Sequence, residues 1–181
     1  MISFFWQGCL HPLSVPGHLL VLLALGLLLG QQDKFSLRSS LGLFVLSLVL
    51  ALVLTPLLPP LQYNEFILLL LAFILSLLVI IKLPLPLGLV LCLSVSTALL
   101  LGLDSRAPRL PGLAVSKIYL HALGTSLSAS LILTLLASLS FYLNKLLAGI
   151  AVRIIGAWIA ASSLMVLALL IQHSLPLLTA P

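Results

Sequence analysis

The segment FILLLLAFILSLLVII, from Phe66 to Ile81, contains one hydroxyl group and no charge. Its apolar residues run without the in-and-out alternation that a strand of an outer-membrane barrel shows. The segment from Leu87 to Leu103 has the same character. Because a transmembrane helix needs about 20 predominantly apolar residues, these runs predict an all-α helical bundle in a bilayer.

The composition of the whole chain points the same way. Of its 181 residues, 62% are hydrophobic and 6% are charged, whereas a soluble domain has roughly 45–50% apolar and about 25% charged residues. This composition excludes collagen-like, disordered and disulfide-scaffold proteins. The net charge of +5 comes from scattered single cations rather than a basic block, so the expected partner is the lipid bilayer and not a nucleic acid.

Six apolar segments predict a polytopic bundle of about six transmembrane helices, forming one integral membrane domain over residues 1–181. Polar residues and prolines interrupt the apolar sequence and mark the loops between these segments. The expected spans are Leu10 to Gly30, Ser40 to Leu58, Phe66 to Ile81, Leu85 to Leu103, Ile118 to Leu143 and Leu147 to His173.

An even number of spans places both termini at one end of the bundle, here called the terminal end. The cations at the opposite end are Lys34, Arg38, Lys82, Lys145 and Arg153, and those at the terminal end are Arg106, Arg109 and Lys117. Since Lys and Arg are enriched in cytoplasmic loops, we expect extracytoplasmic termini in a bacterial-type inner membrane.

Most of the residues able to bind a cation fall toward the terminal end. His173 ends the last expected span and is interpreted as a residue of the membrane interface; the other five are His11, His18, Glu65, Asp104 and His121. Ionisable groups inside a membrane are costly and usually functional, and imidazoles with carboxylates suit a borderline divalent cation. These five residues are therefore candidate metal ligands. The alternative is that the histidines are satisfied by backbone carbonyls or by water among the lipid headgroups.

The spacing of His11 and His18 puts both on one helix face, but roughly 10 Å apart along an unbroken helix. Pro12 and Pro16 could leave this segment partly unwound and bring the two rings together. Two histidines with Glu65 would then form a plausible set of ligands. Because protons compete for the imidazole lone pairs, we expect capture to weaken as the pH falls from about 8 to 5.

A polar stripe follows the expected fifth span inward from His121. Ser126, Ser130, Thr134 and Ser138 recur every four residues. Hydroxyl groups at this spacing could line a hydrated route for an ion, or could let helices approach and hydrogen-bond across their contact.

The opening helix, GCLHPLSVPGHLLVLLALGLLLG from Gly8 to Gly30, resembles that of the HupE/UreJ family of membrane proteins associated with nickel supply. The family pattern is His, five residues, Asp-His and a glycine-punctuated helix. His11, His18, Gly26 and Gly30 match it, and Gly17 stands where the family has Asp. The resemblance implies a permease for nickel, with cobalt as a second substrate, that uses His11 and His18 and holds no permanent cofactor.

The motifs of several other classes of function do not occur in the sequence. The chain has no Gly-rich phosphate loop, so we expect no ATP, and no HExxH or nucleophile-elbow motif, so we expect no enzyme. A non-transporting accessory or assembly subunit, or a carrier of another small solute, remains the alternative to a metal permease. The sequence leaves open whether the chain forms a homo-oligomer.

Overall fold

The computed structural model describes residues 2–57, 64–106, 115–146 and 148–179, and every regular element in these ranges is helical. The elements are α1 (Ile2–Ser14), α2 (Pro16–Gly30), α3 (Lys34–Leu54), the short 3-10 helix η1 (Thr55–Leu57), α4 (Asn64–Ile81), α5 (Leu87–Asp104), α6 (Val115–Leu146) and α7 (Ile150–Thr179). Helices α3 to α7 are long and apolar enough to span a bilayer, and α1 with α2 forms a sixth span if this bent pair is counted as one. The prediction of a polytopic all-α membrane bundle is confirmed.

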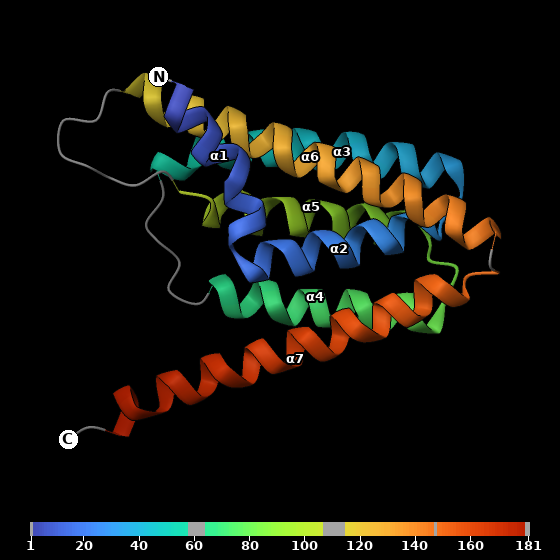
Figure 1. The fold of residues 1–181 in the computed structure, drawn as a ribbon. Helices are drawn as coiled ribbons and strands as arrows, with labels where there is room; N and C mark the ends of the chain where they lie inside the picture. The colour runs from blue at the N-terminus through green and yellow to red at the C-terminus, as the bar shows by residue number, and fades with distance from the viewer. Residues whose placement is uncertain (1, 58–63, 107–114, 147, 180–181) are drawn as a thin grey trace.

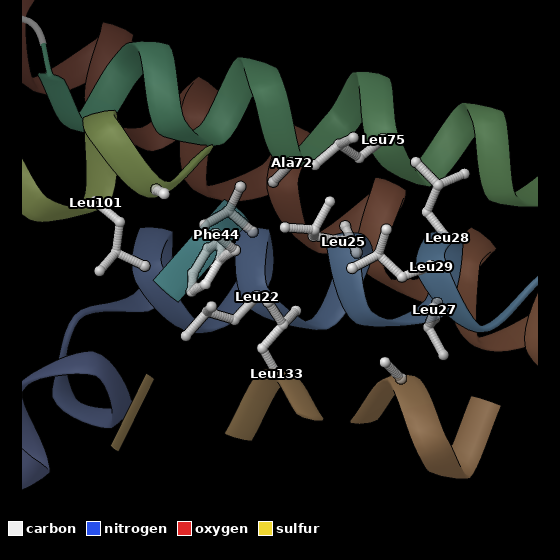
Figure 2. Packing of buried hydrophobic residues seen from close by; sticks show 14 of the residues in the cluster. Leu22, Leu25, Leu27, Leu28, Leu29, Phe44, Ala72, Leu75, Leu101 and Leu133 are labelled. Carbon is white, nitrogen blue, oxygen red and sulfur yellow. The ribbon is translucent and has the colours of Figure 1, made fainter. Parts of the chain in front are cut away.

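Helix α2 lies at the centre of the bundle, between α4 and α6 (Figure 2). Its leucines Leu22, Leu25 and Leu28 are fully buried, and a helix that is apolar on every side is expected where other helices surround it. The remaining helices pack in pairs around it, α1 against α6, α3 against α5, and α4 against α7 (Figure 1). The first turn of α2, which carries His18, is therefore held on several sides.

Glycines allow the closest contacts between these helices. On α2, a Cβ added at Gly26 would lie 2.7 Å from the Cβ of Leu136 in α6, and one added at Gly30 would overlap the side chain of Ser140. The Ser140 hydroxyl donates a hydrogen bond of 2.9 Å to the carbonyl of Leu27 across the same contact. The small residues of α2 therefore mark a helix contact, as such spacing commonly does in membranes.

The helices are arranged as an even number of spans requires. The first residues of α1 and the last residues of α7 lie at the same end of the bundle, and α4 and α6 also begin there (Figure 1). At the opposite end, the Nε of Arg153 donates to the carbonyl of Ile80 (2.7 Å) and the Nζ of Lys82 donates to that of Ala148 (3.0 Å). Ile80 lies in the last turn of α4, and cations are stabilised at the C-terminal end of a helix, where the helix dipole is negative.

The predicted start of the second span at Ser40 is wrong, since α3 begins at Lys34. The cause is an N-cap. The carboxylate of Asp33 accepts hydrogen bonds from the backbone N–H groups of Phe35 and Ser36, which have no partner inside the helix.

Some predicted positions differ or cannot be compared. The last helix continues to Thr179, beyond the expected end at His173. Leu58, Arg109 and Leu147, which we used for span boundaries and for the charge balance, lie outside the described residues.

Candidate metal-binding site

The predicted span from Leu10 to Gly30 is not one straight helix. Helices α1 and α2 are bent by 70° relative to each other, and Val15 between them has an extended backbone (φ −98°, ψ 114°). A residue that precedes proline is disfavoured in the helical region, and proline is well suited to the first turn of a helix. Pro16 therefore ends the first helix and begins the second, and His11 and His18 lie on either side of the break.

The bend brings the two rings together, as the partly unwound alternative predicted. The ring centroids of His11 and His18 are 5.2 Å apart, and His121 of α6 joins them with its centroid 5.6 Å from that of His11. We call these three residues the histidine cluster. Its members His11 and His121 come from α1 and α6, two helices that pack against each other and whose first residues lie at the terminal end of the bundle (Figure 1).

Two glycines at this crossing place His121 in the cluster. A Cβ added at Gly8 of α1 would overlap the backbone carbonyl of His121, and one added at Gly124 of α6 would overlap the carbonyl of Phe5. The hydroxyl of Ser128 also donates to the carbonyl of Cys9 (2.6 Å). Close backbone contact between α1 and α6 therefore sets the distance between His11 and His121.

His18 is fully buried, and its partner is an acid from a distant part of the sequence. Its Nε2 lies 2.8 Å from Oδ2 of Asp104, the last residue of α5, across 86 positions of sequence. The Asp104 side chain is 26% exposed. The Asn64 side chain, in the first turn of α4, also lies close to this carboxylate. The site thus combines a buried imidazole with a carboxylate that reaches the surface.

Two ring nitrogens in the cluster are buried without a hydrogen-bond partner. They are Nε2 of His11 and Nδ1 of His18. Leaving a buried polar atom unpaired costs about 1–3 kcal/mol, so most such atoms in proteins have a partner. Two unpaired nitrogens on neighbouring rings can offer lone pairs to a positively charged ligand.

The spacing of the rings suits a shared metal ion, although the rings are not oriented as a coordination site requires. A metal at about 2.1 Å from a nitrogen of each of two imidazoles keeps the ring centres roughly 4.5–6.5 Å apart, and both centroid distances fall in this range. Within the described residues, however, no three His, Cys, Asp or Glu side chains are arranged so that they could hold a metal ion. Coordination by the cluster would require the rings to turn.

A small pocket lies beside His121 of the cluster. It has a volume of about 40 Å³, and His121 lines it together with Thr55, Ser105 and Arg106. A volume of this size admits water. His121 therefore has space for water beside its ring.

Glu65 lies apart from the histidine cluster. It is half-buried in the first turn of α4, and a Cβ added at Gly17 would lie 3.7 Å from its Cγ. The described contacts of the three rings and of Asp104 do not include Glu65. Of the five candidate ligands, the structure brings together His11, His18, His121 and Asp104, and it places Glu65 beside Gly17.

The hydroxyl stripe of α6 does not lead into the bundle. Ser126 is buried near the cluster, but Thr134 and Ser138 are exposed on the outer surface. The hydroxyls that contact other helices are those of Thr125, Ser128 and Ser140, which donate to backbone carbonyls of α1 and α2. These three hydroxyls, which lie beside the stripe, therefore stabilise contacts between helices.

These features define the class of protein: a polytopic helical membrane protein with a histidine and carboxylate cluster at one end. The chain matches the family model described as HupE / UreJ protein over residues 2–167, and it belongs to this family. The family consists of transporter-like membrane proteins and is associated with nickel and cobalt transport. Searches of curated proteins and of solved structures gave no match.

Proposed function

We propose that this protein is a permease that moves a divalent transition metal, Ni²⁺ or Co²⁺, across the inner membrane. The metal is the transported substrate and not a permanent cofactor. Membership of the HupE/UreJ family supports the choice of metal. Neutral imidazole is a preferred ligand of nickel, and a nearby carboxylate compensates positive charge in a medium of low dielectric constant.

The observation that carries the proposal is the meeting of three histidine rings at the break between α1 and α2. The break, the fully buried position of His18 and the two unpaired ring nitrogens all occur at one point. In a membrane, non-helical backbone and buried polar groups are tolerated mainly where they serve a binding site or a pathway.

In the proposed mechanism, the ion enters from the terminal end through the pocket beside His121 and is captured by His11 and His18. Glu65 lies at the same end, where its carboxylate attracts cations toward the entrance. Beyond His18, the fully buried side chains of Val21, Leu22 and Leu25 close the centre of the bundle. Transport therefore requires a second arrangement of the helices in which this apolar barrier opens.

The proposal is tested by measuring cellular nickel and cobalt by mass spectrometry in a host that lacks its own importer. We expect the wild-type protein to raise the content of at least one metal, and His18→Ala to abolish that rise at equal membrane expression. Leu48→Ala is the matched control, because it also removes a fully buried leucine, in α3, but neither a metal ligand nor a side chain of the apolar barrier. A rise that survives His18→Ala would contradict capture by the cluster.

No rise in either metal with the wild-type protein correctly inserted would instead favour the accessory subunit or a carrier of another solute. That outcome would separate loss of transport from loss of folding, since insertion is measured in the same cells.

A further inference from the structure

We propose that Asp104 is a positioning residue that holds His18 in the tautomer with the proton on Nε2, so that Nδ1 is the nitrogen presented to the metal. This inference rests on the proposed function, because it assigns roles within the same site. It distinguishes the two acids at this end of the bundle: Asp104 acts through His18, whereas Glu65 lies beside Gly17.

The assignment follows from the hydrogen bond between the two residues. Oδ2 of Asp104 lies 2.8 Å from Nε2 of His18. An ionised carboxylate can only accept a hydrogen bond, so Nε2 must carry the proton. In a neutral imidazole the other nitrogen then has the free lone pair. That nitrogen, Nδ1, is the buried atom of His18 that has no partner.

The geometry around His18 leaves Asp104 as the acid that can orient it. The neighbouring position on α2 is Gly17, which has no side chain, and a Cβ there would face Glu65, Leu68 and Leu69 of α4. The carboxylate comes instead from the C-terminal residue of α5. An acid thus reaches His18 from another helix although α2 provides none beside it.

The end of α5 is held in place by a second contact. The Nδ2 of Asn64 donates a hydrogen bond of 3.0 Å to the carbonyl of Leu100, one turn before Asp104. This bond links the first turn of α4 to the last turn of α5. The bond therefore helps to hold the backbone that carries Asp104 against α4.

This arrangement has a chemical consequence for the metal. A histidine that donates its second N–H to a carboxylate keeps one ring orientation and becomes a more basic ligand. The carboxylate also offsets part of the charge of a divalent ion in a medium of low dielectric constant. Substitution of such a partner typically weakens metal affinity by about 10- to 100-fold.

The test uses the full-length protein in detergent with ¹⁵N-labelled histidine, since the chain has only 4 histidines and single substitutions assign their signals. Nitrogen chemical shifts distinguish a protonated from an unprotonated ring nitrogen. We expect His18 to show a protonated Nε2 and an unprotonated Nδ1 in the wild-type protein, and we expect Asp104→Asn to lose this preference, because an amide can donate to Nε2 as well as accept from it.

The second measurement is the Kd for Ni²⁺ by titration calorimetry. We expect Asp104→Asn to raise it about 10- to 100-fold, while the matched control Asp33→Asn, an acid at the opposite end of the bundle, leaves it unchanged. A wild-type His18 protonated on Nδ1 would overturn the inference without any variant having to fold. Unchanged Ni²⁺ affinity in Asp104→Asn would overturn it while leaving the permease intact, whereas a wild-type protein that binds neither Ni²⁺ nor Co²⁺ in the same titration would overturn both proposals.

Discussion

The close contact of α1 with α6 predicts that a single methyl group can separate the histidine cluster. Gly8→Ala places a Cβ against the backbone carbonyl of His121. A backbone carbonyl cannot turn away as a side chain can, so the two helices must move apart. Forcing an extra group into a packed interior costs about 1–3 kcal/mol, although replacement of a helical glycine by alanine returns up to about 1 kcal/mol.

Gly42→Ala provides the control, because nothing lies within 4 Å of a Cβ added at Gly42 in α3. It has the same gain in helix propensity without the clash. The two variants should therefore differ by about 1–3 kcal/mol, which corresponds to melting temperatures roughly 2–12 °C apart for a chain of this length. The assay is thermal unfolding of the purified proteins in the same detergent.

Gly8→Ala should also weaken Ni²⁺ binding, because His11 moves away from His121, and Gly42→Ala should not. We expect a loss of about tenfold in affinity, equal to about 1.4 kcal/mol. Equal melting temperatures and equal Ni²⁺ affinities for the two variants would refute the argument that the Gly8 contact positions the cluster.

Two further predictions concern the N-cap of α3 and the orientation of the bundle. The Ser36 hydroxyl and the backbone N–H groups of Ser36 and Phe35 donate to Asp33 and hold the pKa of its carboxyl below the usual value. The stabilisation by this cap is therefore present above the unfolded-state pKa and is lost as the pH falls through the lower folded-state pKa. Asp33→Ala should lower the melting temperature at pH 7, and its difference from wild type should vanish in acid. A difference that stays constant with pH would argue against the charged cap. With both native cysteines replaced by serine, a cysteine at Lys117 should react with a membrane-impermeant thiol reagent on intact cells and one at Lys145 should not, and the reverse pattern would invert the orientation.

The sequence was sufficient to predict the bundle because each span carries its own signal. Continuous apolar runs and their interruptions are local features, and the helices lie close to the predicted positions. The early start of α3 has a local signal as well, since aspartate is one of the preferred residues at the N-cap of a helix.

The candidate site could be predicted only in part. The prolines around His11 and His18 indicated that the helix could break, and the structure places the break at Val15. The approach of His121 and Asp104 depends on contacts between distant helices, such as the one between Gly8 and His121, and one sequence gives no signal for these. A glycine at position 17 pointed to a missing acid, but only the fold shows that α5 supplies one to His18.

The most direct test of metal permeation is Ni²⁺ entry into lipid vesicles that contain the purified protein and a trapped fluorescent chelator. Wild-type protein should give a saturable signal above that of protein-free vesicles. His11→Ala combined with His18→Ala should remove this signal, while Leu48→Ala, which removes a fully buried leucine of α3, should retain it. Entry no faster than in protein-free vesicles, or equal entry with the double variant, would contradict transport of the metal through the histidine cluster.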